Sequence, residues 1–96
     1  MSKAEVINIL SQFNEEAKAK YKSKIIGLFG SYARNEGSQE SDIDILIEKD
    51  GDLTLFDLSA LKIRLEEKLN ARVDIVTTTA LREEIKSYVM NDLIYV

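Results

Sequence analysis

The segment Ser41–Ile47 places two carboxylates on a short stretch that is otherwise apolar. Asp42 and Asp44 alternate with isoleucines before the segment becomes continuously hydrophobic, a pattern typical of a half-buried strand. Because side chains two residues apart on a strand point to the same side, we expect both carboxylates on one face. Ile43, Ile45 and Ile47 would then face the core. The fold must therefore contain a sheet that buries one face of this strand and leaves the other accessible.

Two carboxylates one strand step apart can serve as metal ligands. Their separation of about 6–7 Å along the backbone allows them to converge on two divalent cations about 3.5–4 Å apart. Hard oxygen ligands of this kind suit Mg²⁺ or Mn²⁺. A bare Asp-x-Asp pair is more often a solvated strand edge or turn, so the metal interpretation depends on the neighbouring segments.

The first such segment is an apolar strand predicted over residues 24–29, which ends on Gly30-Ser31. Gly30 permits a tight turn and a close approach of the backbone to a ligand. Ser31 is placed to cap a short helix predicted over residues 32–36, whose free N–H groups would form an anion site. An ordinary strand-to-helix turn has the same sequence, so this feature alone does not establish phosphate binding.

The second segment, residues 72–77, is another short predicted strand with Asp74 at its centre, on the face opposite Val73 and Ile75. Taken alone, Asp74 is better explained as a surface residue. If this strand pairs beside Asp42 and Asp44, however, Asp74 supplies a third carboxylate to the same side of the sheet. It could then ligate one metal and help to deprotonate an attacking hydroxyl.

Composition narrows the chemistry. The 96 residues are expected to form a single domain over residues 1–96, and they include no cysteine and no histidine. Thiolate chemistry, histidine-based proton transfer and the usual zinc sites are therefore excluded. Catalysis would have to use carboxylates, Lys, Arg, Tyr, hydroxyls and metal.

Charge and hydropathy bear on location and partners. Thirteen basic against seventeen acidic residues give a net charge of −4, the wrong sign for a nucleic-acid binder, so no direct nucleic-acid binding is expected. No segment approaches the roughly 20 apolar residues of a membrane span, and the N-terminus has the pattern of a helix rather than of a signal peptide. We therefore expect a cytoplasmic location and no membrane association.

The remaining periodicities complete an alternation of helices and strands. Ser2 and Glu5 have the spacing of a capping box for a helix that reaches about Tyr21. A leucine stripe predicts a second long helix that ends near Asn70. A final helix is predicted to bury Leu81, Ile85, Tyr88 and Val89, with a break at Asn91-Asp92 before a strand over residues 93–96. The order predicts an α/β (α+β) layer structure.

These motifs resemble the nucleotidyltransferase superfamily related to DNA polymerase β, and specifically its minimal, MNT-type members. The resemblance is carried by Gly27–Arg34 (Gly-Leu-Phe-Gly-Ser-Tyr-Ala-Arg), Ser41–Ile47 and Val73–Thr77, and it extends through the predicted closing helix and last strand. Asn35 departs from the glycine that is frequent there, although Asn tolerates left-handed backbone well. The resemblance implies a mixed sheet of about four strands with helices mainly on one face.

The resemblance also implies an activity: transfer of a nucleoside monophosphate, AMP from ATP, to a hydroxyl with release of pyrophosphate. Gly30 and Ser31 would hold phosphates, with Arg34 and Ser41 assigned to the same nucleotide site. The carboxylates Asp42, Asp44 and Asp74 would carry two Mg²⁺ or Mn²⁺ ions and act in catalysis. For Arg34 we keep an alternative, an ion pair with Asp42, Glu36 or another nearby carboxylate.

The acceptor is expected on another molecule, because larger relatives carry acceptor-binding domains that this chain lacks. MNT-type proteins resemble antitoxins that pair with HEPN-type RNase toxins. Some of these antitoxins act by adding AMP to a tyrosine of the toxin. The leading hypothesis is therefore modification of a HEPN-type partner. One alternative is a non-catalytic module that occludes its partner, with the apolar Leu93–Val96 as a docking or dimerisation edge. The other is transfer to a small-molecule alcohol by a homodimer.

Overall fold

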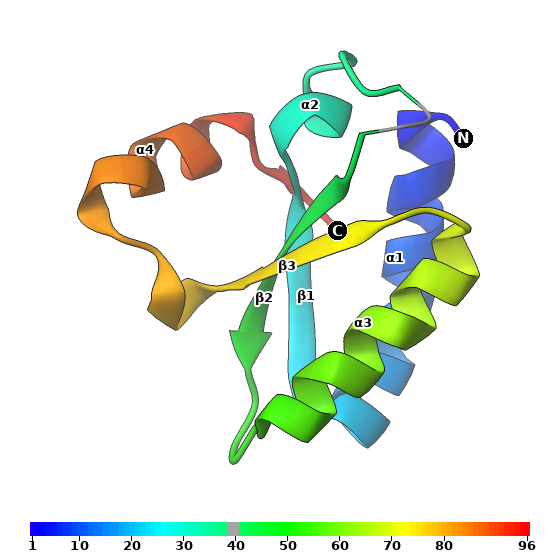
Figure 1. The fold of residues 1–96 in the computed structure, drawn as a ribbon, viewed down its shortest axis with the longest axis vertical. Coiled ribbons are helices and arrows are strands. Elements are labelled where there is room, and N and C mark those ends of the chain that lie inside the picture. Colours follow the sequence, from blue (N-terminus) through cyan, green and yellow to red (C-terminus); the bar gives the residue numbers. More distant parts are fainter. Residues whose placement is uncertain (39–40) are drawn as a thin grey trace.

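The computed structural model describes residues 1–38 and 41–96, which form a mixed sheet with helices on both sides (Figure 1). The helices are α1 (Lys3–Tyr21), α2 (Gly30–Ala33), α3 (Leu55–Leu69) and α4 (Glu83–Asp92), with a 3₁₀ turn, η1 (Thr78–Ala80). The strands are β1 (Ser23–Phe29), β2 (Ile43–Lys49), β3 (Val73–Thr77) and β4 (Ile94–Tyr95).

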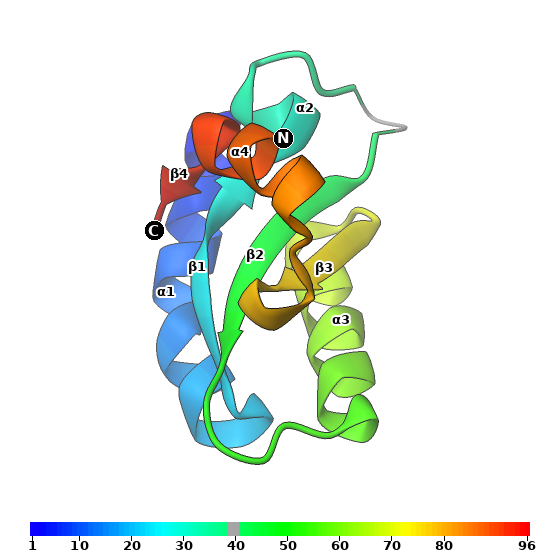
Figure 2. The same ribbon diagram turned by 90° about the vertical axis from the view of Figure 1, so that its left-hand side faces the viewer.

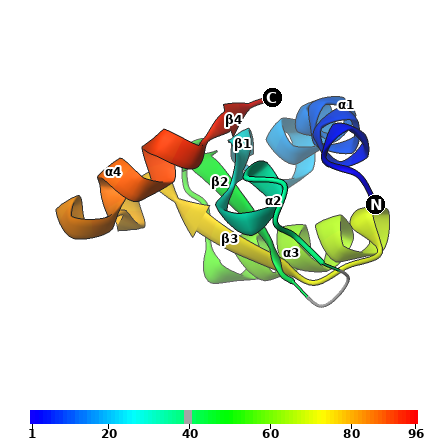
Figure 3. The same cartoon turned by 90° about the horizontal axis from the view of Figure 1, so that it is seen from above.

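The sheet has the order β3-β2-β1-β4. β1 is antiparallel to both β2 and β4, whereas β2 and β3 are parallel and are connected through α3. The two long helices, α1 and α3, lie on one side of the sheet, and α4 lies on the other (Figures 1 and 3). The predicted mixed sheet of about four strands, with helices mainly on one face, is confirmed.

The core lies between the sheet and the two long helices. Both helices begin with a capping box: Glu5 N donates to Ser2 Oγ (3.2 Å) and Asp57 N donates to Thr54 Oγ1 (3.2 Å). Each ends where the next residue, Lys22 or Asn70, adopts positive φ. The residues buried between them are Val6, Leu10, Phe13, Ala17, Ile25, Leu28, Ile43, Ile45, Ile47, Leu61, Leu65, Leu69 and Val73. This burial holds β2 with its isoleucines inward, as predicted.

Gly27 makes room for the last strand. A Cβ atom at this position would lie 2.2 Å from the carbonyl oxygen of Ile94, so only glycine allows β4 to approach β1 this closely. β1 also carries a register irregularity between Ile25 and Gly27. Asn14 of α1 bonds both backbone groups of Ile25 there (2.9 and 3.1 Å). The docking of β4 brings the end of α4 beside the turn that follows β1 (Figure 2).

Two local predictions need correction. The short helix spans Gly30–Ala33 rather than residues 32–36, and Ser31 lies inside it instead of capping it, because Phe29 occupies the cap position. In α4 only Val89 is buried, whereas Ile85 and Tyr88 are 48% and 74% exposed and Leu81 precedes the helix. The reason is that α4 meets the rest of the molecule mainly at β1 and α2 and otherwise projects from the sheet (Figure 3).

A helix that crosses a membrane must be both long and apolar. Within the described parts of the chain, none is both long enough and apolar enough to cross a bilayer.

Candidate functional site

Two of the three predicted carboxylates lie side by side on neighbouring strands. Asp44 of β2 is in register with Asp74 of β3, and on its other side with Phe29 at the end of β1. Paired residues of adjacent strands share a face, and the strands are about 4.8 Å apart. The strand that carries Asp74 thus pairs beside the strand that carries Asp44, which is the condition that the sequence left open.

Gly30 packs directly against Asp44. Its φ is +77°, in the left-handed region, and a Cβ atom there would lie 2.1 Å from Asp44 Oδ2. The glycine therefore has two reasons to be at this position, the backbone conformation and the space that the carboxylate occupies. The turn after β1 is therefore packed against the Asp44 carboxylate of β2.

Asp42 lies immediately before β2 and is held differently. Its Oδ1 accepts from Arg72 Nε at 3.1 Å, and its side chain is 50% exposed. The backbones are joined at the same point, since Ile43 N donates to Arg72 O (2.9 Å). Arg72, which precedes β3, thus links the starts of two parallel strands. Sequence reasoning gave no role to this arginine.

The carboxylates form a repulsive electrostatic environment. The pKa of Asp44 is raised from 3.8 to about 6, first by burial and then by the negative charges of Asp74 and Asp42, while Arg34 acts in the opposite direction. A cation bound beside Asp44 would reduce the repulsion between its half-buried carboxylate and the other two.

Oxygen donors of this type fit Mg²⁺ or Mn²⁺. Within residues 1–38 and 41–96, however, no three acidic side chains converge into a complete ligand set. Asp42 in particular is turned to Arg72. The fit to a cation therefore rests on donor type and on the crowding of charge at Asp44, and the remaining ligands would come from water and substrate.

Replacing Asp44 by Asn should stabilise the metal-free protein. A carboxyl group whose pKa is higher in the folded than in the unfolded state lowers stability as pH rises from about 4 to about 6, and the loss persists above that. Because the group is partly solvated, we expect a gain of about 1 kcal/mol for Asp44→Asn at pH 8 in EDTA. The gain should vanish near pH 4. Urea unfolding at both pH values measures it, and a less stable variant at pH 8 would contradict this electrostatic account.

The two predicted serines lie on either side of the loop between α2 and β2. Ser31 is half-buried in the first turn of α2, where its carbonyl accepts from Glu36 N (2.8 Å). The Ser41 hydroxyl accepts from Ser38 N (3.1 Å) and lies 3.2 Å from Ser38 Oγ. Ser31 thus lies next to Gly30, whereas the Ser41 hydroxyl is bonded to Ser38.

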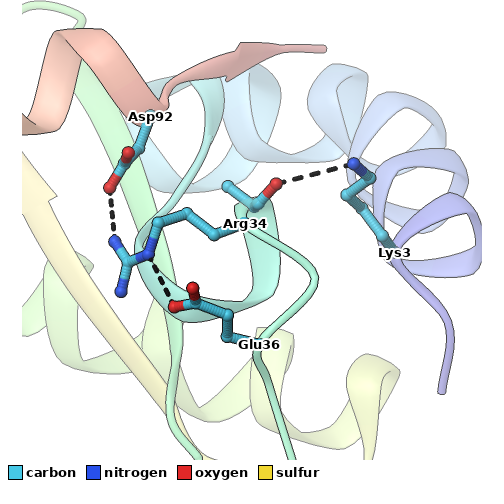
Figure 4. Close-up of polar contacts among 5 residues, drawn as sticks. Lys3, Arg34, Glu36 and Asp92 are labelled. Atoms are coloured by element: carbon cyan, nitrogen blue, oxygen red, sulfur yellow. Dashed lines mark hydrogen bonds and ion pairs between the residues drawn. The ribbon is translucent and has the colours of Figure 1, made fainter.

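Arg34 follows α2 and is paired with two carboxylates (Figure 4). Its Nε donates to Glu36 Oε2 at 2.9 Å, and its Nη1 donates to Asp92 Oδ2 at the end of α4. The alternative considered for this residue, an ion pair with Glu36 or another nearby carboxylate, is therefore present. Asp42 is not its partner, because that carboxylate binds Arg72.

A family model described as "Nucleotidyltransferase domain" matches residues 10–96. The chain belongs to the nucleotidyltransferase domain family. It is thus an enzyme of the nucleotidyltransferase type, and the resemblance inferred from the motifs is confirmed.

Two curated relatives of this nucleotidyltransferase match it along nearly their full length. A candidate protein adenylyltransferase of Methanocaldococcus jannaschii is 40% identical over 94 residues, which cover 97% of this chain and 96% of the relative. The protein adenylyltransferase MntA of Thermococcus cleftensis is 34% identical over 92 residues, covering 96% and 93% respectively.

Solved structures share the fold. A candidate minimal nucleotidyltransferase superimposes with a TM-score of 0.78 and 31% identity, over 100% of this chain and 97% of the other. A chain from the complex of tri-AMPylated Shewanella oneidensis HEPN toxin with MNT antitoxin gives a TM-score of 0.57 and 26% identity. That match covers 88% of this nucleotidyltransferase and 69% of the other chain.

Proposed function

We propose that this nucleotidyltransferase transfers AMP from ATP to a hydroxyl of a HEPN-type partner protein and so acts as an antitoxin. The observation that carries the proposal is the pairing of Asp44 with Asp74 against the Gly30 turn. Support for a protein acceptor comes from the relatives named as protein adenylyltransferases and from the structure that contains an AMPylated HEPN toxin. We place the activity in the cytoplasm, in a single domain over residues 1–96 without direct nucleic-acid contacts.

The three carboxylates would act on the reacting groups. Asp44 and Asp74, together with Asp42 once it leaves Arg72, would hold two Mg²⁺ or Mn²⁺ ions, which would neutralise charge on the phosphates. Asp74, which is exposed on the outer strand, would accept the proton of the attacking hydroxyl. The new bond joins the acceptor oxygen to the α-phosphorus, and the bond from that phosphorus to the bridging oxygen breaks to release pyrophosphate.

The turn after β1 would bind the rest of the donor. Backbone N–H groups at Gly30 and Ser31, with the Ser31 hydroxyl, would meet the β- and γ-phosphates. Arg34 lies one helical turn further on and would add a cation to the same side. Ser41 would contribute only after leaving Ser38. We therefore assign phosphate binding chiefly to Gly30 and Ser31.

Mass measurement tests the reaction. With Mg-ATP and the cognate HEPN protein, the partner should gain the mass of one or more AMP groups, and EDTA should prevent the gain because the metal ligands lose their cations. Intact-mass spectrometry followed by peptide mapping locates the modified hydroxyl. A confirmed complex whose partner keeps its mass in the presence of Mg-ATP would contradict the proposal.

Occlusion without catalysis is the second candidate, because β4 is an edge strand and Tyr95 is 66% exposed. An edge of this kind can pair with a strand from another protein. A protein that neutralises its partner by occlusion would protect without nucleotide. The first substitution in the Discussion separates the two candidates.

A further inference from the structure

Arg34 forms ion pairs with two carboxylates that differ strongly in solvent exposure (Figure 4). The Glu36 side chain is 63% exposed and lies two residues away in the chain. The Asp92 side chain is 18% exposed and comes from the far end of α4, 58 residues away. A less solvated carboxylate interacts more strongly with a cation, so Asp92 is the more effective of the two partners.

The Asp92 contact connects two elements that the sequence separates. Arg34 belongs to the turn that starts with Gly30, and Asp92 is the last residue of α4, just before β4 docks on β1. α4 is otherwise mostly exposed, with Val89 as its buried residue. The ion pair therefore ties the position of the arginine to the docking of the C-terminal segment.

Some N–H donors of Arg34 are not used by its two ion pairs. A guanidinium has five N–H donors, and the bonds to Glu36 and Asp92 leave Nη2 unused by the part of the chain that the structure describes. The backbone N–H of Arg34 also donates to Gly30 O (3.2 Å), and Gly30 packs directly against Asp44. Arg34 therefore belongs to the same turn as the groups that would bind the phosphates.

We propose that Asp92 is a positioning residue of the nucleotide site, which holds the Arg34 guanidinium so that its remaining N–H donors meet the triphosphate of the donor. The inference rests on the proposed function for its ligand, a nucleoside triphosphate. Without Asp92, the flexible arginine would have to be ordered at the moment of binding, which weakens affinity. A purely structural ion pair that anchors α4 is the competing explanation.

A double-mutant cycle separates positioning from anchoring. Asp92→Asn, Arg34→Met and the double variant are measured for binding of a fluorescent, non-hydrolysable ATP analogue with Mg²⁺, and for thermal midpoint. Asp92→Asn should weaken binding about fivefold in the native background and less than about twofold in the Arg34→Met background. Glu84→Gln, which removes an exposed charge from the same helix, is the control and should leave binding unchanged.

Equal weakening in both backgrounds would overturn the proposal, as would unchanged binding accompanied by a lower thermal midpoint, the signature of anchoring alone. If Asp92→Asn does not fold, Asp92→Ser enters the same cycle with the same criteria. The assay contains no acceptor protein. A coupled cycle without AMP transfer would therefore contradict only the proposed function, and AMP transfer with an additive cycle would contradict only the role of Asp92.

Discussion

Replacing Asp42 and Asp44 together by asparagine is expected to lower AMP transfer by at least about 1000-fold, which corresponds to about 4 kcal/mol of transition-state stabilisation. Asparagine keeps the shape of each side chain and removes the charge that would hold the cations. The fold should persist, because the Arg72 pair that Asp42 loses is half-exposed and contributes at most about 1 kcal/mol. Relief of repulsion at Asp44 offsets that loss.

The readouts are the mass of the partner, its co-purification and protection of cells from it. Catalysis predicts that the double variant still binds the partner but no longer protects. Occlusion predicts that it protects fully. Asp50→Asn is the matched control, since it makes the same chemical change at an exposed residue just after β2 and should retain transfer. A double variant with near-native transfer would exclude both carboxylates as metal ligands.

Gly30→Ala is expected to reduce transfer by about 100-fold and to destabilise the protein. The new Cβ would lie 2.1 Å from Asp44 Oδ2, so the carboxylate or the turn must move. A displacement of about 1 Å of a reacting or ligating group can cost about 100-fold in rate. The left-handed φ of +77° adds about 1–2 kcal/mol of strain for any residue with a Cβ, and the collision adds about 1–3 kcal/mol more.

Gly51→Ala separates strain from collision. Gly51 has nearly the same φ, +79°, but a Cβ atom there meets nothing within 4 Å. It should therefore share the conformational cost of about 1–2 kcal/mol and keep full transfer activity. Urea unfolding and initial rates of AMP transfer measure both variants. Equal loss of activity in the two, or none in Gly30→Ala, would show that contact with Asp44 does not matter for the site.

The parts of the fold that depend on local pattern were predictable. The capping box at Ser2 and the leucine stripe that ends before Asn70 each specify a helix through neighbouring residues. α4 was predicted with the wrong buried face, because its apolar positions have helical spacing whether or not anything covers them. Ile85 and Tyr88 stay exposed since α4 packs near β1 and α2 rather than across the sheet.

Contacts that join distant segments could not be predicted. Arg34 needed a carboxylate, and candidates within reach along the chain included Glu36, yet Asp92 lies 58 residues away and meets it only because β4 docks on β1. That docking in turn depends on the missing side chain of Gly27. A glycine inside a predicted strand was the available signal for such a close approach.

The sequence by itself determined which chemical groups the proposed site can use: carboxylates at Asp42, Asp44 and Asp74, a glycine turn before them, and neither histidine nor cysteine. The residue types and their spacing along single strands carry that information. Only the tertiary structure decided that Asp74 lies opposite Asp44, that Asp42 pairs with Arg72 and that Asp92 holds Arg34. Strand register and the docking of α4 are settled by burial of the whole core, to which residues far apart in the chain contribute jointly.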